Sequence, residues 1–501
     1  MAGGQSDFDG QFVISAASEP VERGWTRQSF GKFNLDMAPG CQCVRVFDRS
    51  GRKIGLLLGT PIDLKRNSII TSDYSIEEAL ANASQIDSFV EKHIYGLTGT
   101  FLFILSAFGL NRIYLDCNGS MSVVYSAEKK TAGATAAVLL DSGEYSARFR
   151  KDLYDALDVD NAGWFTVGLT AHRGISRLLC NHYLDLDKWV AVRHWPLAAI
   201  TSAHDLKQTF RNISDRVTQT INLLADNDIT RVALTAGSDS RYLLACSRPL
   251  LDKVSFVTVG APAGEIDVAC SKLLARKFNL KHDILPYKEA TSAEIALWRL
   301  RAGHCVGGNN VKLHPSVRPL EGHFFVGGLG GEIGRGFLWL NAEPDTPLDA
   351  NNLVARLKLP QIPEVIEKVG EWLKPLERYD TLFKLDLAYI ELRMSAWGFC
   401  DTYVKPKQKE LHPMVSRANY VDMLSIPPDL RRGGKMFPEI IAMLWPELLS
   451  QPINRYGDWR DQFAVVKKAL RDPNRARRKA VQLFRTVWMP TGKQNMEEKA
   501  Q

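Results

Sequence analysis

The sequence predicts an α/β protein in which a domain built on a parallel sheet follows a β-rich domain. Short apolar runs separated by turn residues fill the first 150 residues. Between Val232 and Leu285, apolar runs alternate with helical segments, which is the pattern of βαβ crossovers and a parallel sheet. A loop of small and hydroxyl residues, Thr235–Ser240, joins one of these strands to the helix that follows it.

Length and composition set the broad class. A chain of 501 residues has the length of two domains, and 45% apolar and 24% charged residues are typical of a globular protein. The N-terminus lacks a signal pattern and no run of about 18 apolar residues occurs, so we expect no membrane span and a cytoplasmic location. The eight cysteines lack zinc-site spacing, which fits a reducing compartment.

The net charge of +7 owes much to a basic stretch between Lys467 and Lys479. A solvated helix face is the favoured interpretation, and attraction to an anionic polymer or lipid surface is the alternative. We therefore expect no nucleic-acid partner, and we leave a homodimer open as the oligomeric state.

The β-rich half is predicted from alternating strands and turns, which together indicate an antiparallel layered domain. Asp116–Gly119 has the composition of a turn. Strands are expected at Gly55–Gly59, Gly99–Leu105, Arg112–Leu115 and Met121–Tyr125, and a helix is expected at Ser75–Ala83.

The second half opens with a helix over Asp205–Asp226, predicted by apolar residues at three- and four-residue steps. A strand at Val254–Val259, a helix at Asp267–Phe278 and a strand at His282–Leu285 follow the Thr235–Ser240 loop. Ligands of parallel sheets lie at the carboxyl ends of the strands. We therefore expect the loop to hold phosphates and the rim that follows Val259 to hold a nucleoside.

The Thr235–Ser240 loop has the chemistry of a phosphate cradle. The helix after it offers free N–H groups and the positive end of its dipole. Gly237 lets the backbone approach closely, and the hydroxyl groups of the loop add donors. Asp239 is a carboxylate beside the expected phosphates, which indicates a Mg²⁺ ligand. A capped turn without a ligand is the alternative.

A second chemical stretch, Phe324–Phe337, is a strand that enters a loop with six glycines. Such a loop can press its backbone against a ligand. Glu332 is its one acidic residue, and Arg335 is suited to a bidentate contact with a carboxylate or phosphate. A merely flexible glycine loop is the alternative.

These stretches resemble the asparagine synthetase family of pyrophosphate-loop ATPases, whose fold is adenine nucleotide alpha hydrolase-like. The family's loop reads Ser-Gly-Gly-x-Asp-Ser, and this chain departs from it at Thr235 and Ala236. In the glycine loop the family's first Glu falls on Gly328 and its Asp on Gly331, so that only Glu332 remains.

The first half resembles the glutaminase part of the same family, an Ntn-hydrolase-like domain. Gly99–Phe101, Asp116–Gly119 and Val123–Tyr125 follow the family's order. The family's nucleophile is an N-terminal Cys next to its own amine, and residue 2 is Ala2 here. The resemblance implies a degenerate glutaminase-like domain over 1–150, a connecting segment over 151–200 and an ATP-binding domain over 201–501, without glutamine hydrolysis.

Segments near the end of the chain follow the family as well. His412–Arg417 resembles a segment on the acceptor side, with Ser416 in the place of an Asp. The family's pyrophosphate-binding Lys would fall near Pro452–Arg455, where Arg455 offers a positive charge, and Lys435 is a second candidate.

The resemblance implies an ATP- and Mg²⁺-dependent ligase that forms amides. It would adenylate a carboxylate, either aspartate or a divergent acid, and release AMP and pyrophosphate, with ammonia or a substrate amine as the attacking group. Related degenerate members act in peptide cyclisation, β-lactam formation and surface-polysaccharide modification. A nucleotide-binding scaffold with a decayed site is the alternative.

The same resemblance assigns the site residues. Catalytic roles fall to Glu332, Lys435 and Arg455, and metal binding falls to Asp239 and Glu332. Nucleotide contacts are expected from Leu234, Thr235, Ala236, Gly237, Ser238, Asp239, Ser240, Val259, Gly260 and Gly328.

Overall fold

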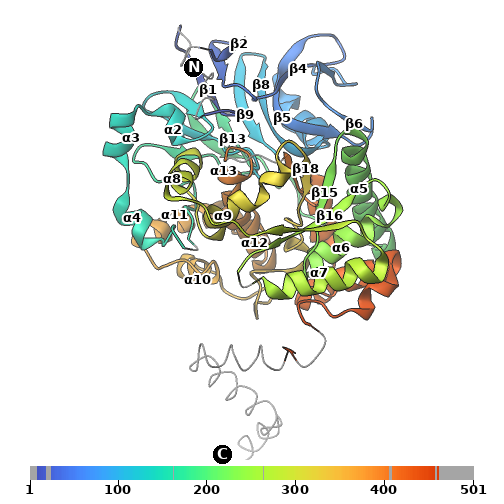
Figure 1. Ribbon diagram of the computed structural model, residues 1–501. Coiled ribbons are helices and arrows are strands. Elements are labelled where there is room, and N and C mark those ends of the chain that lie inside the picture. Colours follow the sequence, from blue (N-terminus) through green and yellow to red (C-terminus); the bar gives the residue numbers. More distant parts are fainter. Residues whose placement is uncertain are drawn as a thin grey trace, which may run out of the picture.

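The computed structural model describes residues 8–18, 24–161, 163–262, 264–404, 409–456 and 460–461. Two sheets lie face to face in the N-terminal half, and a five-stranded parallel sheet with its helices forms the C-terminal half (Figure 1). The prediction of a parallel-sheet domain preceded by a β-rich one is therefore confirmed. The Ntn-hydrolase-like character of the β-rich part and the three domain boundaries stay predictions, and the basic stretch after Lys467 lies outside the described residues.

The N-terminal sheets have six and eight strands. The first has the order β12 (Ser176–Arg177), β10 (Val124–Ser126), β11 (Thr131–Gly133), β1 (Phe12–Ser15), β3 (Phe33–Met37), β2 (Thr26–Phe30). The second has the order β14 (Val190–Arg193), β13 (His182–Asp185), β9 (Leu110–Leu115), β8 (Thr98–Ala107), β5 (Lys53–Asp63), β4 (Cys43–Phe47), β7 (Tyr74–Ser75), with β6 (Ser68–Ile69) on β5. All pairs are antiparallel except β4 with β7. Strands β12 to β14 come from the segment predicted to connect the two domains.

Side chains from both sheets form one apolar core between the layers, because alternate residues of a strand face the same side. Leu56 and Ile104 of the larger sheet meet Ile14 and Leu35 of the smaller one in this core. The opposite face of the larger sheet is covered by α1 (Ile86–Phe89) and the π-helix η2 (Val90–Ile94).

The predicted helix at Ser75–Ala83 is wrong. The Ile76 N–H donates to the Phe47 carbonyl at 2.8 Å, and Asp48 accepts from the Leu80 N–H at 3.2 Å. These tertiary hydrogen bonds hold the segment extended beside β4, so they override its local helix preference. A 3₁₀ turn, η1 (Ala83–Gln85), begins only at the last residue of the predicted range, and α1 follows it.

The parallel sheet has the order β17 (His282–Pro286), β16 (Ser255–Gly260), β15 (Thr230–Ala233), β18 (Phe324–Val326), β19 (Lys409–Leu411). In chain order this is 3-2-1-4-5, so the direction of winding reverses between β15 and β18. The sequence did not predict β19, because its three residues form no apolar run.

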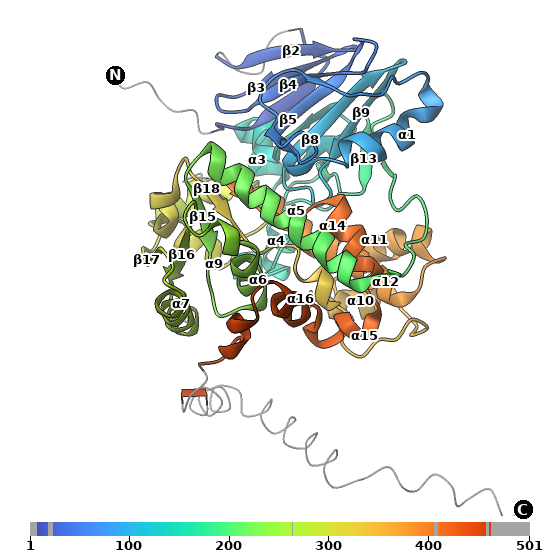
Figure 2. The same ribbon diagram turned by 90° about the vertical axis from the view of Figure 1, so that its right-hand side faces the viewer.

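The helices of this half cover both faces of the sheet. One face packs against α5 (Leu206–Asn227) and α6 (Ser238–Cys246), and the other packs against the 3₁₀ segment η4 (His314–Leu320). Figure 2 shows the β layers stacked on this half, with α5 running along its flank. The remaining helices are α2 (Ala136–Leu139), α3 (Ser142–Arg148), α4 (Lys151–Ala156), α7 (Glu265–Phe278), α8 (Ser292–Arg301), α9 (Asn309–Leu313), α10 (Ala350–Arg356), α11 (Pro363–Leu373), α12 (Thr381–Ala388), α13 (Gly398–Asp401), α14 (Arg417–Ser425), α15 (Pro428–Arg431) and α16 (Met436–Leu444).

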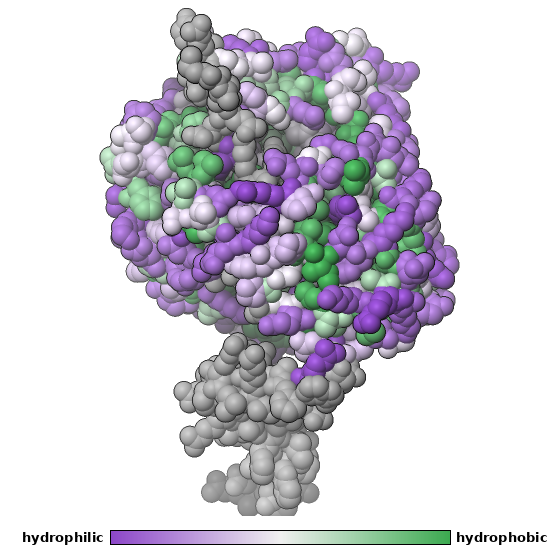
Figure 3. Space-filling model, viewed as in Figure 1, coloured by the Kyte–Doolittle hydropathy of each residue, from purple (hydrophilic) through white to green (hydrophobic). Residues whose placement is uncertain are grey.

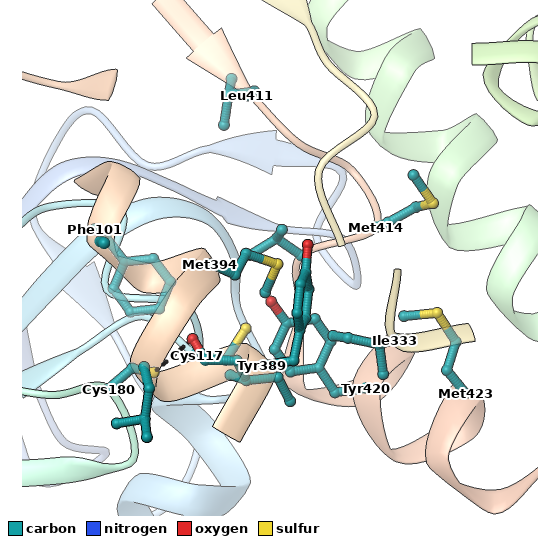
Figure 4. Close-up of a cluster of buried hydrophobic side chains, with 14 of the residues drawn as sticks. Phe101, Cys117, Cys180, Ile333, Tyr389, Met394, Leu411, Met414, Tyr420 and Met423 are labelled. Atoms are coloured by element: carbon teal, nitrogen blue, oxygen red, sulfur yellow. Dashed lines mark hydrogen bonds between the residues drawn. The ribbon is translucent and has the colours of Figure 1, made fainter. Parts of the chain in front are cut away.

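The two halves share a buried junction. Arg193 of β14 makes two hydrogen bonds of 2.7 Å to Glu391, and Asn181 donates to the same carboxylate at 2.9 Å. An apolar cluster continues through the junction (Figure 4). It joins Phe101, Cys117 and Cys180 of the first half to Ile333, Met394, Met414 and Met423 of the second.

Hydrophilic residues cover most of the face in Figure 3, and apolar residues gather in a narrow strip on the side of the parallel sheet. In the described ranges, every helix falls short of the length or apolarity that a bilayer crossing needs.

Candidate active site

The site lies where the winding of the parallel sheet reverses. The loop after β15 and the glycine loop after β18 leave neighbouring strands at the same edge, and this edge is where ligands of such sheets bind. The loops touch each other: a Cβ built on Gly328 would lie 3.0 Å from the Cβ of Asp239. The structure therefore brings together the two stretches that the sequence singled out separately.

The loop after β15 is closed by its own hydroxyl groups. The Ser240 hydroxyl accepts from the Thr235 N–H at 3.0 Å and lies 2.8 Å from the Thr235 hydroxyl, which in turn accepts from the Gly237 N–H at 3.2 Å. Helix α6 begins at Ser238, so the N–H groups of its first turn have no partner within the helix. Together with the helix dipole, they form an anion-binding surface beside Asp239.

Neighbouring segments hold this loop in place. Asp267, in the first turn of α7, accepts from the Ala236 N–H at 2.9 Å, and the Asn454 N–H donates to the Ala236 carbonyl at 2.8 Å. The buried Arg241 of α6 donates to the carbonyls of Leu448 and Gln451 at 2.9 and 3.0 Å. The segment that ends in Arg455, far away in the sequence, is therefore fixed next to the Thr235–Ser240 loop.

Two carboxylates and one guanidinium form the charged centre of the site. Arg335 Nη2 lies 2.8 Å from Asp239 Oδ2 and 3.4 Å from Glu332 Oε1. The pKa of Asp239 is raised to about 7, because the raising effects of burial and of the nearby Glu332 together outweigh the lowering effect of Arg335. Arg335 thus forms an ion pair with both carboxylates.

The remaining carboxylate oxygens fit a hard cation. Asp239 Oδ1 and Glu332 Oε2 are shielded from solvent and accept no hydrogen bond from any described residue. Such buried acceptors cost free energy unless a partner satisfies them, and Mg²⁺ prefers carboxylate oxygens with phosphate oxygens and water. Asp239 and Glu332 therefore suit a cation that a bound nucleotide would bring. No group of three or more metal-ligating side chains occurs among the described residues.

Gly331 leaves room for this arrangement. A Cβ at position 331 would lie 2.3 Å from Asp239 Oδ1 and 3.2 Å from Phe437 Cζ. A side chain here and the present position of the Asp239 carboxylate therefore exclude each other.

The other predicted residues surround the two loops. Val259 and Gly260 end β16, next to a cavity of about 530 Å³ that Gly260, Glu265 and Lys272 help to line. That volume lies within the range of small-molecule sites, about 300–1,000 Å³. Leu234 is fully buried, which leaves only its backbone for a ligand contact.

Both predicted cations are exposed at the border of the site. Lys435 precedes α16 and follows Gly434, whose added Cβ would lie 3.4 Å from Arg335 Cδ. Arg455 follows Asn454, whose N–H donates to the Ala236 carbonyl of the Thr235–Ser240 loop. Neither side chain makes an ion pair with another described residue.

Sequence analysis missed Tyr389, which starts the π-helix η7 (Tyr389–Arg393). Burial raises the pKa of its phenol, with further contributions from Glu332, Arg393, Arg335 and Asp239 in its surroundings. Its ring lies 5.1 Å from that of Phe337. A π-helix turn is frequent at functional sites, but it leaves no reliable mark in the sequence.

Ser416, in the place of the family's Asp, has a structural role. It caps α14 by accepting from the Asn419 N–H at 3.2 Å, and its backbone pairs with Thr98 of the β-rich half. His412 packs against Gly327, and burial lowers the pKa of its imidazole to about 4. The imidazole of His412 is therefore neutral at pH 7.

A second cavity, of about 560 Å³, lies at the junction of the two halves. Residues of the N-terminal sheets line one side of it, and residues near the amino ends of β15, β18 and β19 line the other. Its Asp228 is paired with Lys409 at 2.8 Å. It is at the opposite edge of the sheet from the two loops, so it does not belong to the site described here.

No protein-family model and no curated protein matches the chain. Parts of it are similar to solved structures. The NH₃-dependent NAD synthetase from Campylobacter jejuni, in complex with nitrate, is 16% identical, with 35% of this chain and 84% of that one covered and a TM-score of 0.18. The U34-tRNA thiolase NcsA from Methanococcus maripaludis, with its [4Fe-4S] cluster, is 10% identical, with 39% and 77% covered and a TM-score of 0.19.

A third structure is the glutamine-dependent NAD⁺ synthetase from Acinetobacter baumannii, in complex with ADP. It is 10% identical, with 42% of this chain and 40% of that chain covered and a TM-score of 0.18. Similarities of this size assign neither residues nor an activity, so the site must be judged by its own geometry.

Proposed function

We propose that the chain is an ATP-dependent carbon–nitrogen ligase that adenylates a carboxylate and releases AMP and pyrophosphate, with ammonia or a substrate amine as the acceptor. The observation that supports this most is the meeting of the two loops after β15 and β18. There, the first turn of α6 and the glycine loop bring Asp239 and Glu332 to the same guanidinium, that of Arg335.

Each part of the site has a task in this reaction. The first turn of α6 binds phosphate oxygens, and its dipole favours the pyrophosphate that leaves. Asp239 and Glu332 would hold Mg²⁺, which would neutralise phosphate charge when bound. Arg455 and Lys435 approach from the border of the site and offset the charge of the departing pyrophosphate.

Positioning supplies the remaining rate enhancement. The glycine loop lets the backbone approach the acyl group closely, and the cavity beside Gly260 accommodates the nucleoside. The substrate carboxylate is aspartate or a divergent acid. The His412–Ser416 segment is neutral, so it lacks the negative charge that the Asp of the asparagine synthetase pattern would place there, and this difference favours a divergent acid.

The test is ATP–pyrophosphate exchange with Mg²⁺, first with aspartate and then with pooled carboxylates. Exchange that depends on one acid, and that Asp239→Asn abolishes, is the expected result. Lys409→Gln, at the opposite edge of the sheet, serves as the control and should leave exchange unchanged. Exchange that persists in Asp239→Asn would show that the assigned site is wrong.

A second candidate is a nucleotide-binding protein without turnover. The pairing of Arg335 with Asp239 favours it, because the guanidinium already neutralises the carboxylate that a cation would need. ATP binding by calorimetry together with no exchange for any acid would support this candidate.

A further inference from the structure

We propose that Arg335 is an internal counter-ion of the Asp239–Glu332 pair, which a divalent cation must displace and which then pairs with the nucleotide phosphates. This inference rests on the proposed function, since it assigns a role within the same site. It concerns a residue for which the family's loop pattern gives no role.

The first argument is charge. Among the described residues, Arg335 is the only cation in an ion pair with either carboxylate, at 2.8 Å from Asp239 and 3.4 Å from Glu332. Without it, two like charges would face each other in a largely buried loop junction. The guanidinium thus stabilises the site while the cation is absent.

The second argument is competition. A cation bound by both carboxylates would lie within a few ångströms of the guanidinium, and the two positive charges would repel each other strongly in a site of low polarity. Arg335 therefore lowers the affinity for a free divalent cation. A cation that arrives with a nucleotide meets a smaller penalty, because the phosphates give Arg335 a new partner.

The third argument is freedom to move. The side chain of Arg335 is 27% exposed, its Nε donates to no described residue, and its stem crosses Gly434, which has no side chain to block it. The backbone next to Arg335 is closely packed, since a Cβ on Gly336 would lie 2.4 Å from the ring of Trp339. Only the side chain has to turn toward the first turn of α6, next to Asp239.

The experiment measures Mn²⁺ binding to the full chain by electron paramagnetic resonance, without nucleotide and with α,β-methylene-ATP. Without nucleotide, Arg335→Gln should bind Mn²⁺ at least tenfold more tightly than the wild type does. With the analogue present, Arg335→Gln should bind Mn²⁺ at least tenfold more weakly than the wild type does. Arg335→Lys keeps the charge and should fall between the two. Arg432→Gln removes an arginine that pairs with Glu343 at 3.2 Å outside the site, and it should change neither affinity.

The outcomes separate this inference from the function on which it rests. Equal affinities for free Mn²⁺ in the wild type and in both Arg335 variants would overturn the counter-ion role alone. Absence of Mn²⁺ binding in all of these proteins would overturn the cation site of the proposed function and the inference with it. Tighter Mn²⁺ binding by Arg335→Gln in a chain that shows no exchange would uphold the inference and contradict the ligase activity.

Discussion

Gly331→Ala tests whether the carboxylate of Asp239 must lie where the structure has it. The added Cβ would lie 2.3 Å from Asp239 Oδ1 and 2.8 Å from its Cγ, distances that unbonded atoms do not adopt. Gly331 does not have a positive φ, so the substitution adds a steric conflict without a backbone penalty. Asp239 must therefore turn away, and its hydrogen bond to Arg335 is lost.

The size of the effect follows from that hydrogen bond. A hydrogen bond to a charged group contributes about 1.5–3 kcal/mol, and the lower end applies because the two side chains are 27% and 21% exposed. About 1.5 kcal/mol corresponds to roughly a tenfold change in an equilibrium constant. We expect the Mg²⁺–ATP concentration at half-maximal exchange to rise about tenfold, with a thermal midpoint lower by about 2 °C.

The matched control is Gly370→Ala. Gly370 lies inside α11, and its added Cβ would meet only the Cβ of Ala350, at an ordinary 3.9 Å. This variant should gain up to about 1 kcal/mol from helix propensity and keep wild-type exchange. If Gly331→Ala matches the wild type in both exchange and thermal midpoint, the proposed position of Asp239 is wrong.

Three further predictions concern other groups. Tyr389→Phe keeps the ring contact with Phe337 and removes only the hydroxyl, so the exchange rate should fall about tenfold at an unchanged thermal midpoint; an unchanged rate would exclude a role for the phenol. Arg241→Met leaves buried carbonyls without a donor, so trypsin should cleave after Arg455 severalfold faster, and equal cleavage would contradict the anchoring role. Burial lowers the pKa of His172 from 6.5 to about 3, so the unfolded chain binds more protons in this interval and stability falls as the pH drops below 6.5. His172→Phe should recover about 2 kcal/mol of that loss at pH 5, measured by urea unfolding, and an unaltered pH dependence would argue against a buried neutral imidazole.

The sequence indicated the parallel-sheet fold and both loops of the candidate site, but not how these loops lie relative to each other. Thr235–Ser240 and the glycine loop were singled out separately, and they meet because β15 and β18 are neighbouring strands that end at the same edge of the sheet. β19 and the extended Ser75–Ala83 segment depend on tertiary hydrogen bonds, which leave no periodic pattern. The sequence marked Arg335 as a partner for a carboxylate or phosphate, but only the side-chain geometry identifies Asp239 as that carboxylate.

The glycines at positions 328 and 331 are informative about the choice between ligase and scaffold. Asp239 lies close to both, with its Cβ beside position 328 and its carboxylate beside position 331, and the carboxylate needs the absence of a side chain at position 331. The result is a site with two buried carboxylate oxygens that no described residue satisfies. Each such oxygen costs about 1–3 kcal/mol in the ligand-free protein. A site that had only decayed would gain stability from neutral residues at Asp239 and Glu332, whereas a site that binds a cation with its nucleotide recovers this cost on binding.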